Sequence, residues 1–409
     1  SLSGDCSGSC TGAEFSVNFA APDANSNRIE TPCNAPSTHM HDSSNRPPRI
    51  WLVIGDKLGD NAQVEIIAAA LGLPFEIRRV LPKPQFVLGK PGFKPSLYHL
   101  DLERSDKLEP PWPDFILTIG RRPSMAALWI QEQSQGHSRI ILLGRPKKWI
   151  ERFALVIVPG QYQVPQRDNV LQLNLPLMRP NEAAIDAAAA RWKQRFDTLE
   201  RPITALFVGG QTKPFRFDAA AASELMQKTS RIMTQSGGTL YVSTSRRTPP
   251  DVVAALQDQL PANAILYRWK AHDSENNPYL ALLGLADRFI VTGDSISMMI
   301  EVARRRKPLA IFALPYQQGL VAQCRRMLAR ANRADRAGNS ARRWAPRLFA
   351  ALSRSGLGGY SRDLTAIHDF LYEQKLAVAL GSAFLPGGNA AGDELQRVVG
   401  RLRQLIDSG

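Results

Sequence analysis

Short apolar runs alternate with segments of helical periodicity along most of this chain. The first run, residues 50–54, precedes a polar loop and an apolar helix predicted over 62–71. Apolar runs of roughly 4–8 residues are typical of buried strands, and apolar residues three or four positions apart are typical of helices that cover a sheet. Further strands are expected at 75–80, 115–119, 140–143 and 155–158, with a helix at 124–133. This alternation predicts an α/β fold built on a doubly wound parallel sheet.

The alternation starts again after a proline-containing segment. Residues 173–180 read Leu-Asn-Leu-Pro-Leu-Met-Arg-Pro, which suits a hinge, and an alanine-rich helix runs from 181 toward 199. Strands are then expected at 203–208, 239–242, 264–267, 289–291 and 309–314, and helices at 219–234, 250–256, 278–285 and from 295 onward. The chain is therefore predicted to contain two Rossmann-like doubly wound domains that face each other across a cleft.

These patterns divide the chain into four parts. Residues 1–48 are rich in Ser, Asn, Pro and Gly, so we expect a disordered tail that buries too little apolar surface to offset its ordering. The first domain is predicted over 49–178 and the second over 179–376. In the last segment, 377–409, an amphipathic helix at 395–406 is expected to pack back on the body of the protein.

The bulk composition indicates a globular chain. Of 409 residues, 44 % are hydrophobic, which is enough to form ordinary cores in two or three domains. No apolar run approaches the roughly 18 residues of a membrane span, and the start of the sequence lacks the pattern of a signal peptide, so a cytoplasmic protein is expected. The four cysteines form neither a disulfide framework nor a zinc-binding pattern, so no metal site is expected.

The net charge of +14, from 51 basic and 37 acidic side chains, favours an anionic partner. Arginines are concentrated in the stretch 325–347. Two interpretations of this stretch remain open. It is either a solvated cationic face or a docking face for anionic lipid head groups, which would place the protein peripherally on the inner face of the cytoplasmic membrane. Nucleic acid is not expected as a partner.

The segment 287–308 contains a turn that joins a predicted strand to a predicted helix. The turn reads Thr292-Gly293-Asp294-Ser295, and Glu301 follows Asp294 by seven residues, which returns it to about the same helical face. Such a turn places the first helix amides at the carboxyl end of a strand, where α/β sheets bind phosphates. The alternative is that Asp294 or Ser295 caps the helix and that Glu301 is a solvated surface acid.

Two more loops of the second domain carry groups suited to anions. The first, 209–213, reads Gly-Gly-Gln-Thr-Lys; Gly209 and Gly210 allow a close backbone approach and Lys213 adds a positive charge. The second, 243–247, reads Ser-Thr-Ser-Arg-Arg, and the hydroxyl of Ser245 with the guanidinium groups of Arg246 and Arg247 suits a diphosphate. Together with the Gly293 turn, these loops predict a pocket for a nucleoside diphosphate. Each loop taken separately is also compatible with an ordinary turn or a solvated surface.

Two acids follow the first strand of the first domain. Asp56 and Asp60 lie in the loop 55–61, which lacks the G-x-G-x-x-G pattern of nicotinamide-binding domains. Either carboxylate is placed to act as a general base at the carboxyl end of the sheet, and helix capping is the alternative. His99, His137 and His272 have no recognisable catalytic partners in the sequence, so core or surface roles are expected for them.

The motifs at 209–213, 243–247 and 291–301, with Asn277-Pro278-Tyr279, carry a family resemblance. The chain resembles bacterial relatives of the plant "elongated mitochondria" fission factor, over about residues 49–312. More distantly, the second domain resembles the donor half of GT-B glycosyltransferases. The resemblance to the enzyme that glycosylates the lipid-linked peptidoglycan precursor implies that Glu301 holds the donor ribose. The Leu58-Gly59-Asp60 loop is similar to that of lipopolysaccharide heptosyltransferases, which implies that Asp60 is the base in preference to Asp56.

The resemblance implies a function and an alternative to it. The first domain is expected to bind the acceptor and the second a nucleotide-sugar donor, in an inverting, metal-independent transfer to a lipid or envelope glycan. The donor is a substrate, and no separate cofactor is expected. The plant relative is known for recruiting a dynamin-related protein to mitochondria, which implies instead a non-catalytic adaptor that binds a protein or membrane partner.

Overall fold

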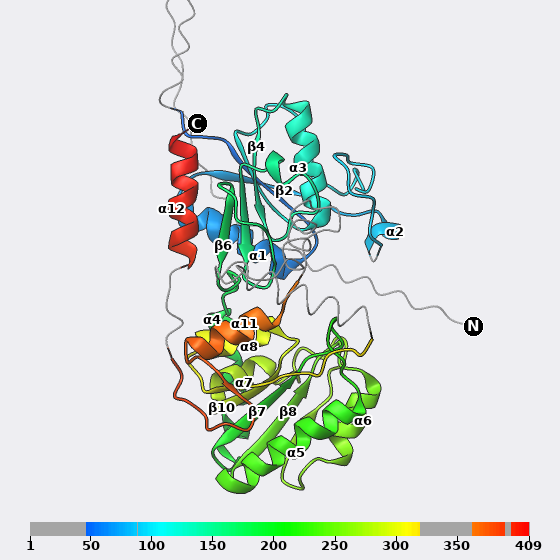
Figure 1. Ribbon diagram of the computed structural model, residues 1–409, viewed down its shortest axis with the longest axis vertical. Helices are drawn as coiled ribbons and strands as arrows, with labels where there is room; N and C mark the ends of the chain where they lie inside the picture. The colour runs from blue at the N-terminus through cyan, green and yellow to red at the C-terminus, as the bar shows by residue number, and fades with distance from the viewer. Residues whose placement is uncertain (1–45, 88, 320–361, 389–393, 409) are drawn as a thin grey trace, which may run out of the picture. The chain divides into compact units, whose positions relative to one another are not determined.

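The protein contains two parallel six-stranded sheets (Figure 1). The computed structural model describes residues 46–87, 89–319, 362–388 and 394–408. The tail at 1–45 and the arginine-rich stretch 325–347 lie outside the described residues. The two sheets confirm the predicted α/β fold with two Rossmann-like halves.

The first sheet has the strand order β2-β1-β3-β4-β5-β6. Its strands are β1 (Ile50–Ile54), β2 (Phe75–Arg79), β3 (Phe115–Ile119), β4 (Arg139–Leu143), β5 (Leu155–Pro159) and β6 (Val170–Leu173). Its connections contain α1 (Leu58–Leu71), α2 (Pro84–Val87), α3 (Arg121–Gln133) and a 3₁₀ turn at Ile150–Arg152. Strand β6 was not predicted, because its last residue, Leu173, is also the first residue of the Pro-containing segment expected to form a hinge.

The second sheet has the order β12-β11-β10-β7-β8-β9. Its strands are β7 (Ile203–Val208), β8 (Thr239–Thr244), β9 (Ile265–Tyr267), β10 (Arg288–Thr292), β11 (Leu309–Phe312) and β12 (Val378–Ala379). The helices are α4 (Glu182–Asp197), α5 (Ala219–Ser236), α6 (Pro250–Asp258), α7 (Tyr279–Leu285), α8 (Ile296–Arg304) and α11 (Thr365–Glu373). Strand β12 and helix α11 were not predicted.

The core of the first half lies on both faces of its sheet. One face packs against α1 and the last helix, α12 (Glu394–Asp407), while the other packs against α3 (Figure 1). Val398 and Leu402 of α12 are buried among residues of β1, β3 and α1. The helix expected at 395–406 thus corresponds to α12, which packs on the first sheet. None of the described helices is long and apolar enough to cross a bilayer.

Each sheet reverses its winding at one point. In the first sheet the chain passes outward from β1 to β2 and then returns to β3 on the other side of β1. In the second it passes from β7 through β8 to β9 and returns to β10 on the other side of β7. A crevice forms where two neighbouring parallel strands send their following loops in opposite directions, and open α/β sheets bind ligands there. The loops after β1 and β3, and those after β7 and β10, therefore define the regions in which to look for function.

Candidate functional site

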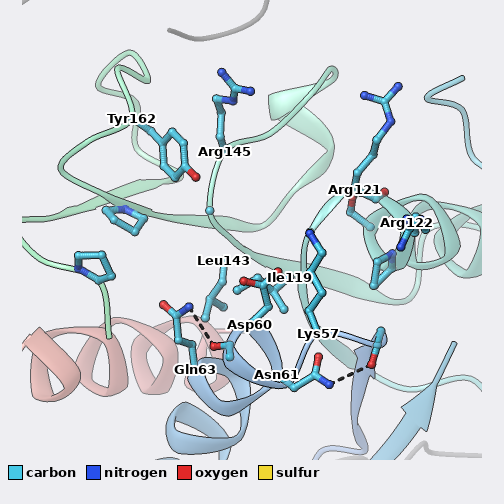
Figure 2. Close-up of a pocket in the computed structure, with 18 of the residues that line it drawn as sticks. Lys57, Asp60, Asn61, Gln63, Ile119, Arg121, Arg122, Leu143, Arg145 and Tyr162 are labelled. Atoms are coloured by element: carbon cyan, nitrogen blue, oxygen red, sulfur yellow. Dashed lines mark hydrogen bonds between the residues drawn. The ribbon is translucent and has the colours of Figure 1, made fainter. Parts of the chain in front are cut away.

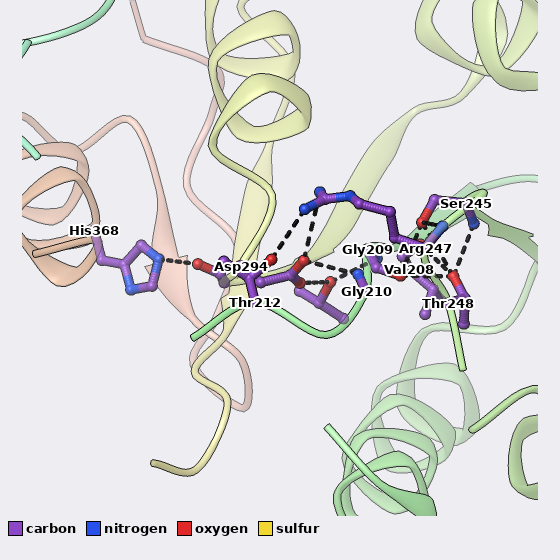
Figure 3. Close-up of polar contacts among 11 residues, drawn as sticks. Val208, Gly209, Gly210, Thr212, Ser245, Arg247, Thr248, Asp294 and His368 are labelled. Atoms are coloured by element: carbon purple, nitrogen blue, oxygen red, sulfur yellow. Dashed lines mark hydrogen bonds and ion pairs between the residues drawn. The ribbon is translucent and has the colours of Figure 1, made fainter. Parts of the chain in front are cut away.

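The loops after β7 and β10 meet through a buried carboxylate (Figure 3). One oxygen of Asp294 accepts a hydrogen bond from the Gly210 amide at 2.8 Å, and the other accepts from the Thr292 hydroxyl at 2.7 Å. The Thr292 hydroxyl in turn accepts from the Gly209 amide at 2.8 Å. Residues 84 positions apart in the chain are thus joined at the point where the second sheet reverses.

The loop after β8 binds to the same place. The hydroxyls of Ser245 and Thr248 donate to the Gly209 carbonyl at 2.9 and 2.6 Å. Arg247 lies 3.8 Å from the Asp294 carboxylate and donates a hydrogen bond to the Thr212 hydroxyl at 3.0 Å (Figure 3). All three loops that the sequence predicted for the donor pocket therefore converge.

The two glycines are required by this convergence. A Cβ on Gly209 would lie 2.4 Å from both carboxylate oxygens of Asp294, and a Cβ on Gly210 would lie 2.2 Å from the Arg247 carbonyl. Such distances are shorter than any van der Waals contact. The glycine pair thus admits a side-chain carboxylate and a neighbouring loop, and the Gly210 amide already donates to Asp294.

Burial raises the pKa of Asp294, while the hydrogen bonds from Gly210 and Thr292 and the charge of Arg247 oppose that rise. A buried carboxylate that keeps two donors and a nearby cation is suited to its charged form. Neither Asp294 nor Ser295 caps α8 through its side chain: Ser295 is the N-cap residue but makes no side-chain capping bond in the described structure. The capping alternative considered from the sequence is therefore not observed.

His368 of α11 also contacts this region. Its ring nitrogen Nε2 donates to the Gly293 carbonyl at 2.6 Å, and the side chain is buried (Figure 3). Sequence reasoning missed this residue, because His368 is far from Gly293 in the chain and no motif surrounds it.

Three other predicted residues lie elsewhere. Lys213 is exposed. Arg246 lines a separate pocket of about 440 Å³ together with Ser245, Arg268 and Trp269. Glu301 accepts a hydrogen bond from the Tyr279 hydroxyl at 2.6 Å, and burial raises the pKa of the Glu301 carboxyl. The predicted roles of these residues in diphosphate and ribose binding stay predictions.

The loops of the first sheet line a cavity of about 900 Å³. Asp56 and Asp60, after β1, and Arg121 and Arg122, after β3, border it at the reversal point of that sheet (Figure 2). Residues of the second half line the same cavity, namely Arg247, Asp294, Ser295, Ile296 and Ser297. The cavity therefore combines the predicted base with part of the predicted donor pocket.

The two candidate bases differ in their surroundings. Asp56 forms an ion pair with Arg122 at 3.4 Å. Asp60 lies in the first turn of α1, which begins at Leu58 rather than at the predicted residue 62, and its carboxylate has no hydrogen-bond or ion-pair partner among the described residues. Burial raises the pKa of Asp60, Lys57 lowers it, and Asp56 raises it further. An unpaired carboxylate with a raised pKa is the better suited of the two to accept a proton.

Basic side chains from several loops of the first sheet line the same cavity. Lys90 lies in the segment between β2 and β3, Arg121 begins α3, and Arg145 and Lys147 follow β4. Burial, together with the smaller effects of the positive charges of Arg145, Arg121 and Lys90, lowers the pKa of Lys147 to about 8. For Arg121, Arg145 and Lys147, a position shortly after a strand end was the available signal. Among the described residues, no group of three His, Cys, Asp or Glu side chains is arranged to hold a metal ion.

Solved structures of nucleotide-sugar enzymes resemble this chain at low sequence identity. The UDP-GlcNAc 2-epimerase of Methanocaldococcus jannaschii is 9 % identical, with a TM-score of 0.44 over 87 % of this chain and 99 % of that one. The epimerase of Neisseria meningitidis, bound to UDP-GlcNAc, is 10 % identical, with a TM-score of 0.40 over 88 % of this chain and 100 % of that one. Because both TM-scores are low, the family assignment rests on sequence matches.

Two curated proteins match in sequence. The uncharacterized protein RP120 of Rickettsia prowazekii is 25 % identical over 303 residues, which span 65 % of this chain and 83 % of that protein. The mitochondrial fission protein ELM1 of Arabidopsis thaliana is 24 % identical over 238 residues, which span 53 % of this chain and 55 % of that protein. The family model described as Mitochondrial fission ELM1 matches residues 59–354. This match includes the Asp60 helix and all three loops around Asp294, and the chain belongs to the mitochondrial fission ELM1 family.

Proposed function

We propose that this protein is an inverting, metal-independent glycosyltransferase that takes its sugar from a nucleoside diphosphate donor. In this proposal the donor diphosphate binds against Arg247, Ser295 and the first amides of α8. The acceptor is a lipid or envelope glycan, and its hydroxyl oxygen attacks the anomeric carbon of the donor sugar. The bond from that carbon to the diphosphate breaks, the nucleoside diphosphate leaves with the electron pair, and Asp60 takes the hydroxyl proton.

The observation that carries this proposal is the content of a single cavity. Asp60 borders it from the first sheet, and Arg247 and Ser295 border it from the second. A transferase needs a base and a diphosphate-binding group within reach of one acceptor hydroxyl. Ile296 and Ser297, the first two residues of α8, also line the cavity. Their backbone amides add the partial positive charge of a helix N-terminus.

Asp60 is suited to the role of base by its environment. Its carboxylate has no partner within the described part of the chain, whereas Asp56 is engaged by Arg122. Partial burial raises the pKa of Asp60 toward the working range of a general base. These features support the order of preference implied by the family resemblance.

The test is nucleotide binding by the full chain and by two variants of neighbouring arginines. Arg247 lines the cavity that contains Asp60, and Arg246 lines a separate pocket. We expect UDP, GDP or ADP to raise the melting temperature, since a ligand at 100 times its Kd adds about 2.7 kcal/mol. Arg247→Gln should weaken the binding of that nucleotide by about tenfold, as loss of a charged hydrogen bond does. Arg246→Gln is the comparison: the present proposal expects the affinity to change by less than about twofold, whereas the sequence-based assignment of Arg246 to the diphosphate expects a loss.

Two outcomes would contradict the proposal. If none of the three nucleotides raises the melting temperature, the proposed nucleotide-sugar donor is contradicted. A loss of affinity in Arg246→Gln with none in Arg247→Gln would place the nucleotide in the smaller pocket, away from Asp60.

The alternative is an adaptor that binds a protein or membrane partner without catalysis. The name of the Arabidopsis relative, a mitochondrial fission protein, favours it. An adaptor has no use for Asp60 and Arg247. The test expresses a chain carrying both Asp60→Asn and Arg247→Gln in a strain that lacks the gene. If this chain restores the wild-type phenotype, the adaptor hypothesis is supported and the transferase hypothesis is contradicted.

A further inference from the structure

The cavity has a strongly basic side. Lys90, Arg121, Arg145 and Lys147, here called the basic cluster, line it from three different connections of the first sheet. Among the described residues, neither Lys90, Arg121 nor Lys147 forms an ion pair with a carboxylate. Uncompensated cations repel one another, and a half-buried group feels that repulsion most strongly.

Two members of the cluster, Arg121 and Arg145, are held in place by neighbouring groups. Arg121 donates two hydrogen bonds to the Pro91 carbonyl, at 3.0 and 2.7 Å, and its guanidinium lies over the Phe93 ring at 5.7 Å. The Arg145 guanidinium lies over the Tyr162 ring at 5.6 Å. Packing of this kind fixes the cations before any ligand arrives, which lowers the ordering cost of binding.

Two side chains of the cluster lie apart from the candidate base. Figure 2 shows Arg121 and Arg145 toward the top of the view, while Asp60 lies on α1 toward the bottom. A ligand that reaches Asp60 with a hydroxyl therefore has cations around another part of its body. Arg247, which the proposed function assigns to the donor, comes from the second sheet and lines the same cavity.

We propose that the basic cluster binds a phosphate group carried by the acceptor, so that the acceptor is a phosphorylated molecule whose hydroxyl is presented to Asp60. That the bound molecule is an acceptor rests on the proposed function. That it carries a phosphate rests on the basic cluster itself. Lys90, Arg121 and Lys147, which form no ion pair with a carboxylate within the described ranges, match a multiply charged phosphate better than a singly charged carboxylate. The phosphate belongs either to a lipid head group or to a soluble phosphorylated sugar.

The first experiment titrates inorganic pyrophosphate into the full chain by calorimetry, with and without saturating UDP. Lys147→Gln removes one cation of the cluster. Lys148→Gln is the matched control, because Lys148 is the exposed next residue and does not line the cavity. We expect pyrophosphate to bind in the presence of UDP, about tenfold more weakly in Lys147→Gln, and within about twofold of the parent in Lys148→Gln. Lys147→Arg keeps the charge and should restore the affinity, which separates binding from any loss of folding.

Proton uptake gives a second readout. Because the pKa of Lys147 is about 8, the amine is about half protonated at pH 8, and a bound anion raises that pKa. Lys147 should therefore take up as much as about half a proton on binding at pH 8. The proton change is measured from the heats in two buffers, and the difference between the parent and Lys147→Gln isolates the lysine from the proton that pyrophosphate itself carries.

The results separate this proposal from the proposed function. Equal pyrophosphate affinities in Lys147→Gln and Lys148→Gln, or no binding once UDP is present, overturn the phosphate site. If UDP does not bind, the proposed donor site is contradicted. The phosphate site is then supported if Lys147→Gln loses pyrophosphate affinity and Arg247→Gln does not. It is overturned if Arg247→Gln loses that affinity and Lys147→Gln does not.

The second experiment distinguishes the two sources of phosphate. It measures cosedimentation with phosphatidylcholine vesicles that contain phosphatidic acid. Weaker binding of Lys147→Gln than of Lys148→Gln supports a lipid phosphate. Equal vesicle binding, together with a positive pyrophosphate result, supports a soluble phosphorylated acceptor.

Discussion

Asp294 shows how one buried residue organises a loop junction. Its carboxylate joins the Gly210 amide and the Thr292 hydroxyl, and Arg247 stands 3.8 Å away. Burial of a charge is costly unless hydrogen bonds and an opposite charge replace water, and both are present here. The glycine at 209 leaves the space that the carboxylate occupies.

The first residue-scale prediction concerns that space. Gly209→Ala places a methyl group 2.4 Å from the Asp294 oxygens, so the carboxylate or the strand end must move. We expect the free energy of unfolding to fall by about 1–3 kcal/mol, as in other overpacked sites, measured by chemical denaturation. Gly59→Ala is the control, because nothing lies within 4 Å of a Cβ there and Gly59 is in helix α1; it should raise stability by up to about 1 kcal/mol. Equal effects of the two changes would contradict the argument.

The second residue-scale prediction concerns His99. Its ring Nε2 donates to the Arg122 carbonyl at 3.1 Å, and burial lowers the pKa of His99 to about 4. The unfolded chain, with a histidine pKa of about 6.5, therefore binds a proton that the folded chain does not bind between about pH 6.5 and 4. The free energy of unfolding should fall by about 1–3 kcal/mol as the pH is lowered through that window, and stay level above it.

Denaturation curves at several pH values check this expectation. His99→Gln should remove this part of the pH dependence, and the exposed His137→Gln should keep it. A His99→Gln protein with the pH slope of the parent would show that another group is responsible.

At the scale of elements, the last helix is part of the first domain's core. Helix α12 contributes Leu395, Val398, Val399 and Leu402 to the cluster that contains β1 and α1, although all strands of the second sheet lie between them in sequence. The Glu394 carboxylate accepts a hydrogen bond from the Asn174 amide at 2.9 Å, which fixes the start of the helix. The segment after the second sheet therefore stabilises the first.

The element-scale prediction follows from that packing. The Leu402 side chain is 1 % exposed, so Leu402→Ala leaves a cavity in the core. It should lower the free energy of unfolding by about 2–5 kcal/mol. Arg403→Ala changes the exposed next position and should stay within about 0.5 kcal/mol of the parent. Hydrogen exchange should show the loss in β1 and β3 amides. A loss of protection confined to α12 would mean that the helix is not needed by the sheet.

At the scale of the whole molecule, the two halves contribute different groups to one cavity. The first sheet supplies Asp60 and the basic cluster, and the second supplies Arg247 and Ser295. In the proposed function this divides the work into proton transfer and donor binding, so that variants of the two halves should have separable effects.

The whole-molecule prediction uses Asp60→Asn. This change should lower the rate of sugar transfer by about 10²–10⁴ while UDP affinity stays within about twofold, because the base acts on the acceptor and not on the donor. Burial raises the pKa of Asp60, so the parent's rate should fall with acid at a higher pH than for an ordinary aspartate, and recover as the carboxylate ionises with rising pH. The measurement is the pH profile of kcat/KM with nucleotide binding in parallel. An unchanged rate in Asp60→Asn would exclude it as the base.

The sequence by itself determined the two α/β halves, most strand positions and the loops that follow them. Burial of a five-residue strand and the amphipathic pattern of a helix are local properties, so they can be recognised in the order of the residues. Strand β6 was missed because it ends at Leu173, where the Pro-containing segment begins. Helix α11 and its buried His368 were missed because no local motif marks them.

Which loop residues meet was decided by the tertiary structure. The order of strands in a sheet depends on pairing between segments that are far apart in the chain, such as β1 with β3 and β7 with β10. That pairing turned Asp294 toward the Gly210 amide, directed the adjacent Arg246 and Arg247 into different pockets, and gathered Lys90, Arg121, Arg145 and Lys147 into one cluster. No periodicity along the sequence encodes such contacts, because each depends on where two distant backbones approach each other.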